Sequence, residues 1–264
     1  MRIEVVTLFP ELIRAALEFG IVGRAIEAGL VEIGTNDPRS HTVDVHRTVD
    51  DRPYGGGPGM VLKPDSLAAA IAGAAARLPM GSPRILLSAQ GEAFDQRRAQ
   101  ELAGLPGFAL VAGRYEGVDE RVIATSIDRE LSIGDFVLSG GEIAALAVID
   151  AVTRLVPGAL GDERSSREES FAAGLLDWPH YTRPEVYAAL AVPAVLMSGH
   201  HAAIRRWRLK QAVGRTWLRR PDLIVRRGLS GEESVLLEEF LAERRMGRAA
   251  DNEGDGHEQD HSGH

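Results

Sequence analysis

Short runs of Val, Ile and Leu alternate with alanine-rich stretches over the first 160 residues, and this alternation constrains the fold more than any other feature of the chain. Two alanine-rich stretches, Leu67 to Leu78 and Ile143 to Val156, predict helices. The apolar runs predict strands at Ile3 to Phe9, Val31 to Gly34, Arg84 to Ser88, Phe108 to Ala112 and Leu131 to Leu138. Strands and helices in alternation are typical of a mostly parallel sheet covered by helices. The sequence therefore predicts an α/β domain over residues 1–160.

The character of the sequence changes near residue 160. Residues 161–173 are polar and lack hydrophobic periodicity, which predicts a mobile linker. Residues 174–248 predict a small all-helical domain, helical mainly from Pro184 onward and interrupted at Pro193 and Pro221. The two parts are therefore expected to fold as separate domains.

The absence of cysteine from all 264 residues narrows the chemistry. It excludes disulfide scaffolds, thiolate zinc sites, iron–sulfur clusters and cysteine nucleophiles, and it fits a reducing compartment. The N-terminus lacks a cationic segment followed by an apolar run, and no 18 apolar residues occur in succession. We therefore expect a cytoplasmic protein without a membrane partner.

Charge is distributed unevenly along the chain. The net charge is −8, yet residues 201–227 carry nine basic side chains against the single acid Asp222: Arg205, Arg206, Arg208, Lys210, Arg215, Arg219, Arg220, Arg226 and Arg227. A run of charge usually marks a solvated face, but this imbalance, with Trp207 and Trp217 among the arginines, favours a nucleic-acid partner. Residues 249–264 contain no Lys or Arg and predict a disordered acidic tail that includes His257, His261 and His264.

Four glycine-rich segments span residues 50–60, 88–91, 113–121 and 132–142, and the last three of them follow successive predicted strands. In an open α/β sheet, ligands gather beyond the carboxyl ends of the strands, and glycine lets the backbone approach a ligand closely. The alternative is that these glycines only form turns. Neither a phosphate-loop motif nor the G-x-G-x-x-G fingerprint is present, which argues against an ATPase of that class and a conventional dinucleotide fold.

Several motifs together carry a family resemblance. They are DDRPYGGGPGM (50–60), GRYEGVDER (113–121), SIGDFVLSGGE (132–142), HYTRP (180–184), VLMSGHHAAIRRWR (195–208) and GRTWLRRPDL (214–223). In this order they resemble the bacterial tRNA (guanine-N1)-methyltransferases of the SPOUT superfamily, over the chain as far as about residue 245. The resemblance implies methylation of the guanosine at tRNA position 37, beside the anticodon.

The resemblance also implies a fold and a cofactor. The first domain is expected to contain a deep trefoil knot, an exception to the rule that chains are unknotted. It is expected to bind S-adenosylmethionine in a bent conformation. The matching motifs place cofactor contacts at Ser88, Gln90, Gly91, Gly113, Tyr115, Gly117, Ser132, Ile133, Gly134, Asp135, Phe136, Val137, Leu138, Gly140 and Gly141.

The chemistry of the reaction requires a base and a cation. Guanine N1 holds a proton, so a base must remove it, and a cation should offset the charge that spreads onto O6. The resemblance assigns the base to Glu169, where many members carry aspartate, and the cation to Arg154. Glu168 is the alternative base, and both glutamates could simply be solvated linker charge. Ala89 and Ala144 also depart from the family, which frequently has proline at these positions.

Further expectations concern partners. The resemblance implies a homodimer whose active site uses both chains, and a helical domain that binds the anticodon arm of tRNA. Mg²⁺ is implied as an aid to proton transfer, without a dedicated protein site. The predicted substrate contacts are Asp50, Gly59, Ser170, Arg205, Arg208 and Arg220. Two other functions stay open: a knotted methyltransferase that modifies another site such as a ribose 2′-hydroxyl, and an RNA-binding module without catalysis.

Overall fold

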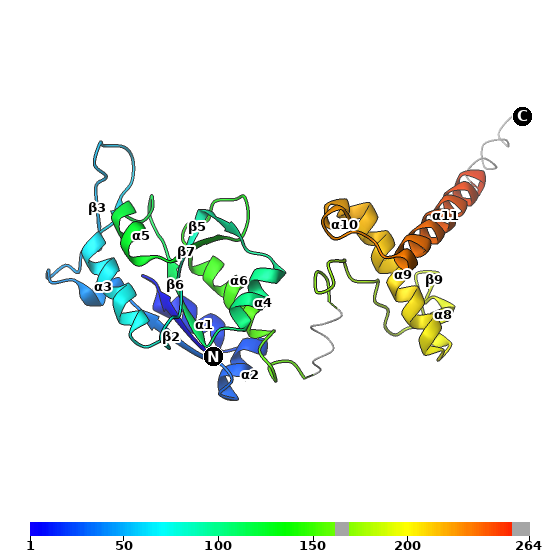
Figure 1. Ribbon diagram of the computed structural model, residues 1–264, viewed down its shortest axis with the longest axis horizontal. Helices are drawn as coiled ribbons and strands as arrows, with labels where there is room; N and C mark the ends of the chain where they lie inside the picture. Colours follow the sequence, from blue (N-terminus) through cyan, green and yellow to red (C-terminus); the bar gives the residue numbers. More distant parts are fainter. Residues whose placement is uncertain (162–168, 255–264) are drawn as a thin grey trace, which may run out of the picture. The chain divides into compact units, whose positions relative to one another are not determined.

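The chain forms two compact units, the first ending at Ser166 and the second beginning at Arg167. The computed structural model describes residues 1–161 and 169–254, with side chains described as far as Met246 (Figure 1). Each unit has its own apolar core.

A five-stranded sheet in the order β2-β1-β6-β5-β7 forms the centre of the first unit. All neighbouring strands run parallel, which confirms the predicted mostly parallel α/β architecture. The central strand β6 is buried along its whole length, as expected for a strand covered on both faces. The strands are β1 (Arg2–Val6), β2 (Glu32–Asn36), β5 (Arg84–Ala93), β6 (Gly107–Ala112) and β7 (Arg129–Ser132).

Helices cover both faces of this sheet, with α3 and α5 on one side and α4 and α6 on the other (Figure 1). Alternate residues of a strand point to opposite faces, so Val5 packs with the α6 side and Val6 with the α3 side. The predicted helices correspond to α3 and α6. The helices of the unit are α1 (Pro10–Leu17), α2 (Gly20–Glu27), the 3-10 helix η1 (Pro38–His41), α3 (Pro64–Ala75), α4 (Gln96–Ala103), α5 (Glu120–Ser126) and α6 (Glu142–Thr153).

The prediction of a strand from Leu131 to Leu138 is wrong beyond Ser132. The hydroxyl of Ser132 accepts a hydrogen bond from the Gly134 N–H at 3.3 Å, and Gly134 has a φ of +150°. The chain therefore leaves the sheet, since a positive φ does not continue a strand. The segment that follows is a loop that returns toward β6.

The second unit is helical except at its start. The helical prediction from Pro184 is wrong over the short hairpin formed by β8 (Val186–Tyr187) and β9 (Leu190–Ala191). Ala188 and Ala189 at its tip have φ of +50° and +63°, which a helix cannot accommodate. A core that includes Leu175, Val213 and Leu237 joins the helices α9 (His201–Arg219), α10 (Pro221–Arg227) and α11 (Gly231–Gly254). The short helix α8 (Ala194–Met197) precedes them and has no buried residue. Helix α11 thus extends past Arg248 into the stretch predicted as a tail.

Candidate active site

A cavity of about 340 Å³ lies beyond the carboxyl ends of β5, β6 and β7. Most of its wall comes from three chain segments: residues 86–90 of β5, residues 113–118 after β6, and residues of the segment 131–141 at the end of β7 and after it. This is the edge of a parallel sheet where ligands are expected, and the volume falls in the range of small-molecule sites.

Nearly all the predicted cofactor residues line this cavity. Those in its wall are Ser88, Gln90, Gly113, Tyr115, Gly117, Ser132, Ile133, Gly134, Phe136, Val137, Leu138, Gly140 and Gly141. Gly91 and Asp135 are not in the wall. The motifs therefore identified the loops, while the position of each residue depends on how the loops are folded.

Gly91 lies where β5 and β7 approach most closely. A Cβ on Gly91 would be only 2.4 Å from the Leu131 nitrogen and 2.5 Å from the Glu130 carbonyl carbon. The register between these strands shifts between Leu87 and Glu92, so the intervening residues bulge from the ladder. The bulge places Ser88 and Gln90 in the cavity wall, whereas Gly91 is required for the close backbone contact.

Charged side chains that were not among the predicted contacts also face the cavity. Arg114, Glu116 and Glu120 are part of its lining, together with Ser139. Arg114 forms an ion pair with Glu142, at 2.9 Å from Nε to Oε2, rather than with Glu116. Partners as distant in sequence as Arg114 and Glu142 carry no local signal.

The segment after the cavity wall is fixed by a helix cap. Asp119 precedes α5, and its carboxylate accepts from both the side chain and the backbone N–H of Arg121. These hydrogen bonds, the side-chain one first, lower the pKa of the Asp119 carboxyl to about 2. Asp119 is therefore anionic at neutral pH and favours the start of the helix.

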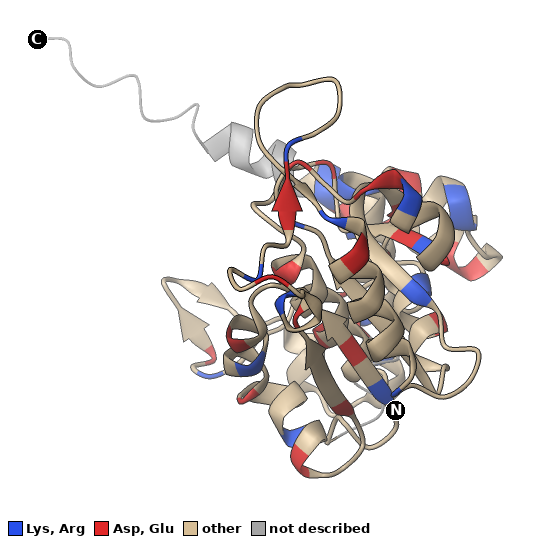
Figure 2. Cartoon of the chain, turned by 90° about the vertical axis from the view of Figure 1, so that its left-hand side faces the viewer, with Lys and Arg blue, Asp and Glu red and all other residues tan. Residues whose placement is uncertain are grey.

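The loop between β3 (Asp50–Asp51) and β4 (Val61–Leu62) adjoins the cavity. It projects from the first unit, with the red strand β3 at its base (Figure 2). The Glu116 N–H donates to the Met60 carbonyl at 2.9 Å, and the side chain of Glu116 lies so close to Gly59 that a Cβ there would be 2.2 Å from Oε1. Gly59 is thus in contact with a cavity residue, while Asp50 lies on β3.

The predicted catalytic residues belong to different units. Arg154 is the C-cap of α6 in the first unit, and Glu169 begins the described part of the second. Ser170 accepts a hydrogen bond from the Asp177 N–H at 2.9 Å and so stabilises the turn after Glu169. Glu168, the alternative base, lies outside the described residues.

The basic stretch of the second unit is partly neutralised. Three ion pairs tie it to α11: Arg206 with Glu239, Lys210 with Glu243 and Arg227 with Glu233. Arg220 is paired with Asp222, Arg208 lies 4.8 Å from the centre of the Trp178 ring, and Arg205 is exposed. The predicted substrate arginines therefore have three different surroundings.

Within residues 1–161 and 169–254, no helix combines the length and apolar character needed to cross a membrane. Among the same residues, no three His, Asp or Glu side chains lie together as metal ligands.

The chain is similar to known proteins over most of its length. The family described as tRNA (Guanine-1)-methyltransferase TrmD matches residues 1–226. Similar curated proteins, each called tRNA (guanine-N(1)-)-methyltransferase, come from Methylococcus capsulatus (58% identical, covering 92% of this chain and 97% of the relative), Sodalis glossinidius (56%, covering 93% and 98%) and Halorhodospira halophila (56%, covering 96% of each). Because both the family match and these relatives span most of its length, the chain belongs to the tRNA (guanine-1)-methyltransferase family.

Proposed function

We propose that this enzyme transfers the methyl group of S-adenosylmethionine to N1 of the guanosine at tRNA position 37. The observation that carries the proposal is the cavity built from three glycine-rich loops at the carboxyl edge of the sheet. Backbone groups of Ile133, Gly134 and Leu138 would hold the adenine, and the loop at Ser88 would close the other side. When bound, the sulfonium of this cofactor supplies an already activated methyl group.

The residues of the chain would remove the guanine N1 proton and stabilise the charge that this leaves on the base. Glu169 removes the proton from guanine N1, which frees the lone pair that attacks the methyl carbon. Arg154 offsets the negative charge that develops on guanine O6. Asp50 accepts from the Watson–Crick edge of a guanine, and the bare backbone at Gly59, beside the cavity residue Glu116, allows a base to approach. Ser170 supports the turn that carries Glu169.

The path of the chain around the cavity supports a trefoil knot. Strand β7 lies at the edge of the sheet, but the segment after it returns to β6, where the Gly141 N–H donates to the Gly113 carbonyl at 2.9 Å. Strand β5 continues past its bulge, so that Ala93 pairs with Ser132. We propose that the returning segment is threaded behind this extension of β5.

The apolar rim of the cavity supports a homodimer with a shared active site. Phe136, Val137 and Ile143 are all more than half exposed on the first unit, next to the cavity wall. Exposed apolar groups of this size are typical of association surfaces. We propose that a second copy of the chain covers them, and that the dimer acts in the cytoplasm, where its tRNA substrate is found.

The decisive test is the position of the transferred methyl group. Purified protein should transfer labelled methyl from S-adenosylmethionine to transcripts with G37 and not to transcripts with A37. Mass spectrometry should locate the methyl group on N1, because only that atom is deprotonated by the proposed base. A methyl group on a ribose 2′-hydroxyl would establish the alternative reaction, and cofactor binding without any transfer would contradict both.

The basic side chains of the second unit should bind the anticodon arm. We expect Arg205→Ala to weaken tRNA binding and to reduce the slope of log affinity against log salt by about 0.7 to 0.9, the contribution of one phosphate. Arg208→Ala and Arg220→Ala should weaken binding as well, Arg220→Ala by less because its guanidinium is paired with Asp222. Filter binding over a range of salt concentrations measures this slope.

A matched control exists next to Arg205. Arg206 is also exposed, but its guanidinium is already paired with Glu239 at 2.6 and 2.8 Å, so Arg206→Ala should change the salt slope less. Cofactor affinity should be unchanged in all four variants. Equal tRNA affinity in the wild type and in the Arg205, Arg208 and Arg220 variants would contradict the proposal that these arginines contact tRNA.

A further inference from the structure

A buried carboxylate lies directly behind the cavity without being part of its wall. Glu142 occupies the first turn of α6 and is only 1% exposed. One of its oxygens accepts from the Thr7 hydroxyl at 2.8 Å, and the other accepts from Arg114 Nε at 2.9 Å. Glu142 thus connects the chain after β1 to the chain after β6.

The direction of these hydrogen bonds follows from their partners. The Phe9 N–H donates to the Thr7 hydroxyl oxygen at 2.9 Å, so the single hydroxyl proton of Thr7 is available for Glu142. Arg114 has only donors. Both oxygens of Glu142 therefore act as acceptors. An amide at the same place would lose the charge of the pair with Arg114 and would leave either Arg114 or the Thr7 hydroxyl proton without its acceptor.

Arg114 transmits this constraint to the cavity wall. Its Nη1 donates to the Ser139 carbonyl at 3.0 Å, and its guanidinium lies 4.4 Å from the centre of the Phe9 ring. A Cβ on Gly140 would be 2.1 Å from Arg114 Nε, so the guanidinium lies directly against that backbone. Ser139 and Gly140 both line the cavity. The loop after β7 is therefore held by an arginine whose orientation Glu142 fixes.

We propose that Glu142 is a positioning residue for the cofactor: through Arg114 it holds the Ser139–Gly141 wall of the cavity in the shape that binds S-adenosylmethionine. The inference rests on the proposed function, because it requires that the cavity holds this cofactor. A charge-assisted buried pair suits this role, since losing one partner leaves the other unsatisfied.

The test uses Glu142→Gln in the full-length protein. We expect the Kd and KM for S-adenosylmethionine to rise about tenfold, equivalent to roughly 1.4 kcal/mol, because the amide removes the charge of the pair with Arg114 and leaves one donor without its acceptor. The kcat at saturating cofactor and the tRNA affinity should stay within about twofold of the wild type. Arg114→Lys should also weaken cofactor binding, since lysine retains the charge but lacks the fork that reaches both Glu142 and Ser139.

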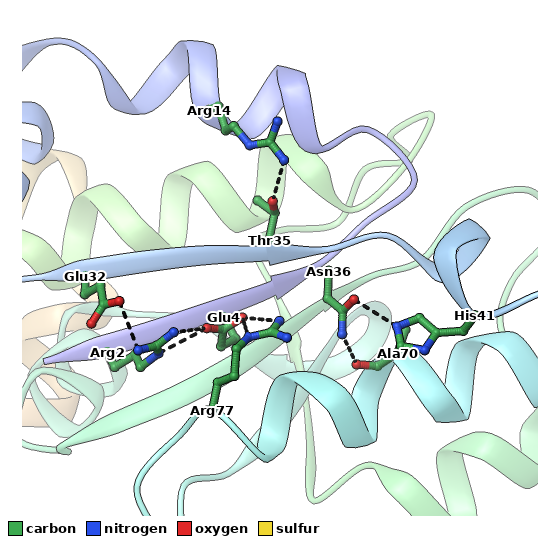
Figure 3. Close-up of polar contacts among 9 residues, drawn as sticks. All are labelled: Arg2, Glu4, Arg14, Glu32, Thr35, Asn36, His41, Ala70 and Arg77. Carbon is green, nitrogen blue, oxygen red and sulfur yellow. Dashed lines mark hydrogen bonds and ion pairs between the residues drawn. The ribbon is translucent and has the colours of Figure 1, made fainter.

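Glu4→Gln is the matched control. Glu4 is another buried carboxylate of the first unit, on β1, and is paired with Arg2 and Arg77 (Figure 3). None of these three residues lines the cavity. This variant should lower the Tm but leave the cofactor Kd within about twofold of the wild type.

The outcomes separate the two proposals. No cofactor binding by the wild type would overturn the proposed function itself. Binding by the wild type with an unchanged Kd in Glu142→Gln would overturn the role of Glu142, as would an equal loss of affinity in Glu4→Gln. If Glu142→Gln does not fold, Thr7→Val decides in its place: it removes one donor to Glu142 and keeps the ion pair, and an unchanged cofactor Kd would overturn the inference.

Discussion

Replacing Glu169 by glutamine should reduce the rate of methyl transfer by about 10²- to 10⁴-fold, the usual contribution of a general base. Glutamine keeps the size of the side chain but cannot take the N1 proton. The single-turnover rate with labelled cofactor measures this step, while the affinities for cofactor and tRNA should be unchanged. The remaining rate should rise with pH, because solution base increasingly replaces the missing carboxylate.

Two controls isolate the carboxylate of Glu169. Glu169→Asp should retain most of the activity, since aspartate keeps the carboxylate that takes the proton. Glu168→Gln should be active if Glu169 is the base. Wild-type turnover in Glu169→Gln would show that Glu168 or water, not Glu169, removes the proton. Arg154→Ala should also lose turnover, because the charge on guanine O6 is then no longer offset.

Replacing Gly91 by alanine should destabilise the first unit by about 3 kcal/mol or more, at the upper end of overpacking effects. The added Cβ would lie 2.4 to 2.6 Å from backbone atoms of Glu130 and Leu131, and backbone atoms cannot move aside as a flexible side chain can. Strands β5 and β7 must separate, so the cavity between them should lose its shape. Thermal unfolding and cofactor calorimetry together should detect both effects.

Gly161→Ala provides the control for this substitution. A Cβ on Gly161 would meet no atom within 4 Å, so the same chemical change should leave the Tm and the cofactor affinity close to those of the wild type. A Gly91→Ala protein with an unchanged Tm would contradict the close contact between β5 and β7. Unfolding without any loss of cofactor affinity in the folded fraction would show that the contact does not shape the cavity.

The loops of the cavity were the most predictable part of the site. Three successive apolar strands are each followed by a glycine-rich segment, and parallel strands bring their carboxyl ends to one edge. The sequence pattern alone therefore placed Ser88, Gly113 and Ser132 near one another. The extent of each loop was less predictable. The apolar residues Phe136 to Leu138 continue the pattern of a strand, but Gly134 turns the chain out of the sheet before they are reached.

Contacts between distant parts of the chain could not be predicted. Ala188 and Ala189 carry no turn signal, and alanine favours helix, yet the chain there forms a hairpin. The pairing of Glu142 with Arg114 and Thr7 joins residues from three elements, and nothing in the spacing of these residues indicates it. Gly91 belongs to a predicted cofactor motif, but its position is fixed by a neighbouring strand.

The sequence by itself determined the α/β class, the parallel sheet and the family, because hydrophobic periodicity and local motifs depend on residues that are near one another in the chain. Only the tertiary structure decided which motif residues face the cavity and which support it from behind. The physical reason is that burial and hydrogen bonding depend on partners such as Thr7, Arg114 and Glu142, which the fold brings together from sites far apart in sequence.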